Sequence, residues 1–160
     1  MKKITFLFLL FVSVVFTGCG EQTTTSYNNQ IVEAHKKLFE ANDTFLNNSL
    51  NFIGKPESKK EFLKLIASTR NKLVAAQKPV DLLAPMNTDH GLRKTMLDMF
   101  DLSIASMDGF EANIEVLTSK GNEEKAATMV QGAFSGLLDL DAEIKAIQVE
   151  YADANNAQLR

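Results

Sequence analysis

The amino-acid sequence predicts an all-α protein, an antiparallel up-down four-helix bundle that follows an N-terminal signal segment. Apolar residues recur three or four positions apart through most of the chain, which is the spacing of one helix face. Leu, Ala, Lys and Glu are frequent, whereas Trp is absent and only 3 prolines occur. No strand-length alternation of apolar and polar residues competes. Each apolar stripe is therefore expected to pack against another helix.

The first helix is predicted over residues 30–54. Gly54 is expected to end it, because glycine adopts the left-handed backbone that closes many helices, and Pro56 prevents continuation. The apolar stripe of this helix comprises Ile31, Val32, Leu38, Phe39, Phe45, Leu46, Phe52 and Ile53.

The second helix is predicted over residues 58–78. Ser58 and Glu61 have the spacing of a capping box, in which each side chain accepts from the other residue's backbone amide. Pro79 is expected to stop the helix, because the residue before a proline disfavours helical angles. An irregular connection over residues 82–91 follows.

The third and fourth helices are predicted over residues 89–120 and 122–154. Thr88 or Asp89 is a candidate cap for the third helix, and Gly121 is expected to separate the two. The resulting order implies two helical hairpins within one domain, over residues 30–160.

The first 18 residues have the pattern of a secretion signal. Lys2 and Lys3 precede an apolar run over residues 4–16, which is shorter than the roughly 20 residues that a membrane-spanning helix needs. The small pair Thr17-Gly18 then comes directly before Cys19. We therefore predict a signal peptide over residues 1–18.

Cys19 is the only cysteine in the chain. The run Phe16-Thr17-Gly18-Cys19 resembles the lipobox of bacterial lipoproteins, which implies that Cys19 carries diacylglycerol and acyl groups and begins the mature protein. A plain secreted protein with a free thiol, or a short uncleaved anchor, is the alternative. Residues 19–29 would then be the lipidated cysteine and a polar tether. No cofactor other than the acyl groups is expected.

The charge of the mature chain limits its partners. Removing Lys2 and Lys3 takes two from the 17 basic residues, which leaves a net charge of about −5 against 20 acidic ones. A mildly acidic body makes nucleic acid a poor partner and predicts no polybasic patch for anionic lipid, so the acyl groups are the expected membrane contact. Gly20, rather than Asp, follows the cysteine and favours the outer membrane of a didermal host.

No catalytic motif is present, and we predict that the protein is not an enzyme. Neither Glu-x-x-His nor His-x-x-x-His occurs, which removes the usual di-iron and zinc-peptidase patterns. His35 lies beside the first apolar stripe, where a hydrogen bond to a backbone or side-chain oxygen is the expected role. Met86 and His90 are a candidate soft-metal pair, but the irregular connection around them favours a structural role.

Two further features of the third helix bear on binding. Its acidic flank is a candidate interaction face, although solvated surface carboxylates are the simpler interpretation; the flank comprises Asp98, Asp101, Asp108, Glu111 and Glu115. Its apolar stripe, with the fourth helix, forms a candidate ligand-binding interior around Phe100, Met107 and Phe134.

Three segments resemble the leptospiral-type family of bacterial surface lipoproteins of unassigned function. They are the lipobox-like run ending at Cys19, the entry to the first helix at 27–32, and the C-terminal segment 148–152 with Asn155-Asn156 after it. The resemblance implies a lipid-anchored helical domain of the cell envelope and supplies no catalytic residues.

The sequence thus leaves two hypotheses for function. The first is a lipid-anchored bundle that acts as a non-catalytic binding or interaction module for an envelope protein. The second is a bundle that holds a small apolar ligand or metal ion between its helices. A pocket between the helices would favour the second.

Overall fold

The computed structural model describes residues 22–156, and all regular secondary structure within them is helical. The prediction of an all-α protein is confirmed.

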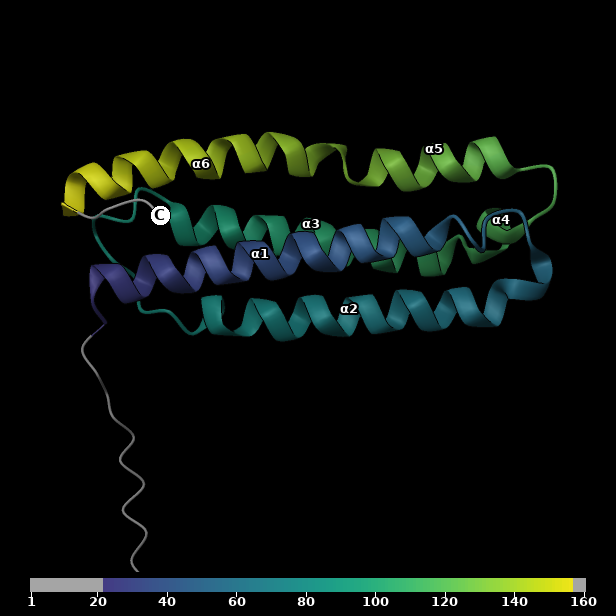
Figure 1. Cartoon of the computed structure of the whole chain (residues 1–160), viewed down its shortest axis with the longest axis horizontal. Helices are drawn as coiled ribbons and strands as arrows, with labels where there is room; N and C mark the ends of the chain where they lie inside the picture. The colour runs from purple at the N-terminus through teal and green to yellow at the C-terminus, as the bar shows by residue number, and fades with distance from the viewer. Residues whose placement is uncertain (1–21, 157–160) are drawn as a thin grey trace, which may run out of the picture.

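Figure 1 shows long helices running lengthwise in an elongated bundle, with the start of α1 and the end of α6 at the same end. We call this the tether end and define it as residues 22–28, 82–92 and 151–156. The helices are α1 (Thr24–Ser49), η1 (Pro56–Ser58), α2 (Lys59–Asp81), α3 (Leu92–Ala112), α4 (Ile114–Thr118), α5 (Glu123–Ala133) and α6 (Ser135–Asn155).

Helix α1 begins at Thr24 instead of Gln30, so most of the predicted tether is helical. A capping box starts it: the Ser26 amide donates to Thr23 Oγ1, and the Thr23 amide donates to Ser26 Oγ, both at 3.1 Å. Tyr27 is completely buried in the first turns. The polar composition concealed this start, because burial of a single large side chain outweighs the low helix propensity of Thr and Asn.

The predicted capping box at Ser58 is wrong. The 3-10 turn η1 runs directly into α2, so Ser58 has backbone angles of φ −90° and ψ 0° and caps no amide with its side chain. Its hydroxyl instead donates to the carbonyl oxygens of Phe52 and Lys55, at 3.1 and 2.7 Å. Ser58 therefore stabilises the turn before α2.

Pro79 lies inside α2, which continues to Asp81, so the predicted stop at Lys78 is also wrong. A proline in the last turn removes only one hydrogen bond. Arg93 compensates at this helix end, because its guanidinium donates to the carbonyl oxygens of Val80 (3.1 Å) and Asp81 (2.7 Å).

The two predicted C-terminal helices are each interrupted. Asn113 separates α3 from α4, and Phe134, with φ −102° and ψ 0°, separates α5 from α6. At the second break the Ser106 hydroxyl of α3, which donates to the carbonyl oxygen of Leu102 (2.8 Å), also lies 3.3 Å from the carbonyl oxygen of Ala133 and shares its proton with it. A side chain from another helix thus helps to stabilise the break, which a helical periodicity cannot reveal. Gly121 has the predicted left-handed conformation, with φ 83°.

The helices pack in a ring that is closed unevenly. α2 lies along both α1 and α3, and α3 lies along α6 (Figure 1). The backbones of α1 and α6 approach each other at very few points. The core of the bundle contains a cluster of phenylalanine rings. Phe45 stacks on Phe110, with ring centroids 5.1 Å apart, and its ring centroid lies 6.2 Å from those of Phe62 and Phe134.

Candidate functional site

Side chains hold α1 and α6 together at the tether end. The rings of Tyr27 and Tyr151 stack with centroids 5.9 Å apart. The Tyr151 hydroxyl donates to the carbonyl oxygen of Thr24 (2.7 Å), and the Tyr27 hydroxyl donates to Asp89 Oδ2 (2.7 Å). Burial and the bond to Asp89 raise the pKa of Tyr27 well above its usual value, so the phenol stays protonated and serves as a donor.

A second link lies further along the same seam, where His35 of α1 meets Asp141 of α6. The distance from His35 Nε2 to Asp141 Oδ1 is 2.8 Å. Burial acts to raise the pKa of Asp141, but hydrogen bonds from Lys145 and His35 hold it below its usual value. The hydrogen bond to an oxygen that the sequence predicted for His35 is confirmed. The pair therefore links α1 to α6.

Beyond this link the seam opens into a groove of about 340 Å³ between α1 and the α5–α6 break. Apolar side chains make up most of its wall, and Leu138, at 68% exposure, stands at its rim. We call it the seam groove; it is lined by Phe39, Asn42, Asp43, Leu46, Gln131, Phe134, Ser135, Leu137 and Leu138.

The polar groups of the seam groove have unused acceptor capacity. Asn42 is 3% exposed, and its Nδ2 donates to Ser103 Oγ at 3.0 Å. Ser103 in turn donates to the carbonyl oxygen of Met99, which fixes the orientation of the Asn42 amide. The remaining Asn42 Oδ1 is buried without a hydrogen-bond partner among the described residues. Leaving such an oxygen unpaired costs about 1–3 kcal/mol.

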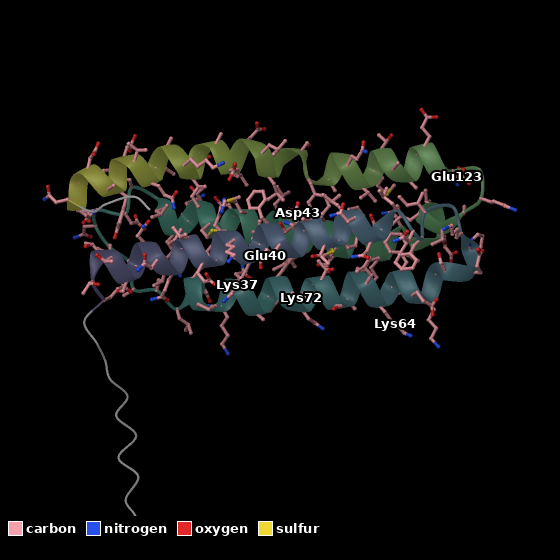
Figure 2. All side chains as sticks on the ribbon, in the orientation of Figure 1. Lys37, Glu40, Asp43, Lys64, Lys72 and Glu123 are labelled. Atoms are coloured by element: carbon pink, nitrogen blue, oxygen red, sulfur yellow. The ribbon has the colours of Figure 1, made fainter. Side chains whose placement is uncertain are left out.

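Asp43 is the only charged residue that lines the seam groove within the described part of the chain. Figure 2 shows it on the side of α1 that faces α5 and α6. It gives the groove an apolar surface with one carboxylate and no cation among its lining residues. Such a surface fits an apolar group that carries a hydrogen-bond donor or a positive charge.

Other surface grooves lie along α1 and α2, and their character differs. One of about 480 Å³ is lined by long charged side chains and small residues, namely Lys37, Glu40, Ala41, Thr44, Lys72, Ala75 and Ala76. It offers no large apolar side chain for contact. The seam groove is therefore the better candidate for recognition of an apolar partner.

The predicted attachment residue, Cys19, lies outside the described residues. In residues 22–156, no helix combines the length and the hydrophobicity that a bilayer crossing requires.

Met86 and His90 both lie at the tether end, but they have different partners. The Tyr151 hydroxyl is 3.9 Å from the Met86 sulfur, whereas His90 Nδ1 is 3.6 Å from Glu150 Oε2. Across residues 22–156, no three His, Cys, Asp or Glu side chains gather where they could hold a metal ion. The geometry thus gives each residue its own local contact.

The acidic flank of α3 and α4 lies mainly at the contact with α2. Arg70 Nε donates to Asp108 Oδ1 (2.7 Å), and Gln77 Nε2 donates to Asp101 Oδ1 (2.7 Å). Two more carboxylates of the flank are paired with lysines: Glu115 with Lys59 of α2, and Asp98 with Lys94 one turn earlier on α3; Glu111 is exposed.

The predicted ligand interior is filled by side chains. Phe100 and Met107 are completely buried, and Phe134 is 8% exposed and also reaches the seam groove. Sequence reasoning missed this groove, although the exposed Leu138 beside a glycine-flanked Phe134 was a usable signal. Periodicity assigned both residues to one continuous buried face, because it does not register the break.

The chain matches no protein-family model, no curated protein and no solved structure. The functional argument therefore depends on the geometry of the chain itself.

Proposed function

We propose that the protein is a lipid-anchored, non-catalytic interaction module of the bacterial cell envelope, attached through Cys19. In this proposal its fold is an antiparallel up-down bundle of four rods: α1, α2, α3 with α4, and α5 with α6. The seam groove is the contact site, and its partner is an envelope protein that inserts an apolar side chain flanked by a donor or a cation.

The observation that carries this proposal is the combination of a filled interior with an apolar groove on the surface. Leu138 extends the apolar lining of the groove to its exposed rim, and contiguous apolar surface of this kind is where partners bind. The groove spans about two turns of α1, from Phe39 to Leu46, which is roughly 10 Å at 1.5 Å per residue. That length suits one or two anchor side chains, as in protein–protein hot spots.

Photo-crosslinking in the native envelope tests the proposal. A photoreactive amino acid at Leu138 is expected to give a discrete crosslinked protein, whereas the same group at Val149, also exposed on α6, should not. Asp43→Lys in the Leu138-labelled chain should reduce the crosslink, because a like charge then meets the donor of the partner. Equal crosslinking from positions 138 and 149 would argue against the groove.

A small apolar ligand is the second candidate, and the mainly apolar wall of the seam groove favours it. A ligand with an N–H or O–H group would donate to the carboxylate of Asp43 at the groove. N-phenyl-1-naphthylamine, a neutral fluorophore with one N–H, is a suitable probe. Leu138→Asp should abolish its fluorescence gain, and Val149→Asp should leave it unchanged. A probe that binds both variants equally would exclude the groove as a ligand site.

The anchor is tested separately by labelling cells with palmitate. Cys19→Ala is expected to remove the label and to leave precursor or soluble protein. Undiminished incorporation into the Cys19→Ala chain would refute the attachment site.

A further inference from the structure

Helix α2 carries a basic face that the net charge of the chain conceals. Six of its residues are Lys or Arg and two are acidic. Lys59 and Arg70 pair with carboxylates of α4 and α3. Four lysines remain exposed, and no carboxylate of the described residues lies within 4 Å of their amino groups; they are Lys60, Lys64, Lys72 and Lys78.

Lys60, Lys64 and Lys78 lie on the outer side of α2, whereas Lys72 lies toward α1, in the groove that it shares with Lys37 and Glu40. Lys60 and Lys78 are 18 residues apart, about five helical turns, so they point in the same direction some 27 Å from each other. Figure 2 shows Lys64 turned away from the bundle. Of the two acidic residues of α2, Asp81 is paired with Arg93 of α3, 3.3 Å away, and Glu61 is exposed next to Lys60. The prediction that the chain offers no polybasic patch rests on its net charge and does not take this local excess of lysines on α2 into account.

The opposite edge of the bundle is acidic. α5 and α6 together carry seven acidic and two basic residues. α1 and α3 lie between this edge and α2 (Figure 1). The two charges are thus segregated across the width of the molecule, and a negatively charged surface would attract one side and repel the other.

The tether end sets where this face stands relative to a lipid anchor. The Gln22 side chain donates to the carbonyl oxygen of Ala84 (2.8 Å) and accepts from the Ala84 amide (3.0 Å), which fixes the chain entry to the end of α2. Cys19 is three residues earlier, so at most about 11 Å of chain separates it from Gln22. Leu82, 74% exposed, lies at the same end of the basic face.

We infer that the outer face of α2, from Lys60 to Leu82, docks on the anionic surface of the bilayer that holds the lipid anchor. This inference rests on the proposed attachment at Cys19. The acyl groups hold the protein at the membrane, and the lysines determine which side faces the lipid. The acidic edge then faces away from the lipid, because anionic headgroups repel it. An anionic bilayer is favoured over a soluble acidic partner because the short connection keeps the C-terminal end of the basic face, with Lys78, close to headgroups.

The natural absence of Trp permits single-tryptophan reporters. The processed, lipidated protein would carry Ala67→Trp on the outer face of α2, or Ala146→Trp on the exposed side of α6. Each is reconstituted in vesicles of brominated phosphatidylcholine with or without about 30% phosphatidylglycerol, a probe composition of roughly the anionic content that polybasic segments recognise. Bromine quenches tryptophan only at short range.

Quenching of Ala67→Trp is expected to exceed that of Ala146→Trp in anionic vesicles and to fall at high salt. Each lysine near an anionic surface contributes about a fivefold factor in partition, so replacing all four by Gln should weaken the contact by roughly a hundredfold or more. A matched control replaces four lysines elsewhere, Lys36, Lys94, Lys120 and Lys125, and should retain the contact.

Palmitate labelling of the same preparations separates the two proposals. A labelled protein with equal quenching at both positions would overturn the docking face and leave the anchor intact. The docking face would also be overturned if the quenching of a labelled protein did not depend on phosphatidylglycerol. The same holds if quenching fell equally in the variant without the four α2 lysines and in the control variant. An unlabelled protein would overturn the anchor itself, and circular dichroism would verify that every variant is folded.

Discussion

The two sides of α1 pack by different means. Against α2, its contact residues include Ala34 and Ala41, and Ala76 on α2 is also buried, so the helix backbones lie close together. Against α6, large side chains such as Tyr27 and His35 span a wider gap. Between α1 and α2 the groove of about 480 Å³ is lined by small and charged side chains, whereas the groove in the wider seam has a mainly apolar lining.

The sizes of the residues along α1 thus determine where the surface of the bundle carries an apolar groove. The wide seam between α1 and α6 is bridged by separate side-chain contacts. Between the contact at Asp141 and the phenylalanine cluster there is room for the seam groove. The break at Phe134 contributes, because residues on both sides of it line the groove.

The largest expected change in stability comes from the aromatic cluster, in which Phe45 of α1 contacts rings on both of its neighbouring sides. Phe45→Ala should lower the free energy of unfolding by about 3–5 kcal/mol, because a fully buried ring with three aromatic neighbours is lost. Urea denaturation followed by circular dichroism measures it. Phe39→Ala, on the same helix but only partly buried, should cost clearly less; equal losses would contradict a shared cluster.

Tyr27→Phe tests the linking contacts at the tether end. Removing a hydroxyl that donates to the Asp89 carboxylate should cost about 1.5–3 kcal/mol in unfolding free energy. Tyr151→Phe removes a bond to a neutral carbonyl and should cost about 0.5–1.5 kcal/mol. If thermal or urea unfolding showed a larger loss for Tyr151→Phe than for Tyr27→Phe, the Asp89 carboxylate would not be the stronger acceptor.

Ala76→Leu tests the narrow seam between α1 and α2. The larger side chain cannot fit between close backbones without displacing them, so overpacking should cost about 1–3 kcal/mol. The exposed neighbour Ala75→Leu should change the stability by less than about 0.5 kcal/mol. If urea denaturation showed that the Ala76→Leu substitution is tolerated, this seam would be looser than the alanine packing indicates.

The smallest effect concerns the link between His35 and Asp141. Because the folded-state pKa of Asp141 is below its usual value, its contribution is present above about pH 4 and is lost as the pH falls through the folded pKa. Asp141→Asn should cost about 0.5–1 kcal/mol at about pH 7, and the difference should vanish in acid. Asp139→Asn, which removes an exposed carboxylate of the same helix that makes no contact with His35, is the matched control. Urea titrations at several pH values compare them.

Sequence reasoning predicted the helical class and the buried stripes well, because periodicity reports burial directly. Phe45, Phe62 and Phe100 were all assigned to apolar faces and are completely buried. Helix boundaries were less predictable. Thr24 begins a helix because Tyr27 is buried, and Pro79 lies within one because Arg93 binds the last carbonyl groups. Both depend on partners that are distant in the sequence.

The candidate site could not be predicted, since it depends on a gap between helices. Asn42 and Leu138 are separated by most of the chain, and nothing in their local sequence indicates that they share a groove. The basic face of α2 was present in the sequence, but averaging the charge over all helices concealed it.

The sequence by itself determined that this chain is helical, where its buried stripes lie and which cysteine is the predicted attachment point, because these depend on periodicity and local motifs. Tertiary structure alone decided where the helices break, which seam stays open and which lysines are left without partners. Those features arise from the sizes and charges of side chains that meet only when the helices pack.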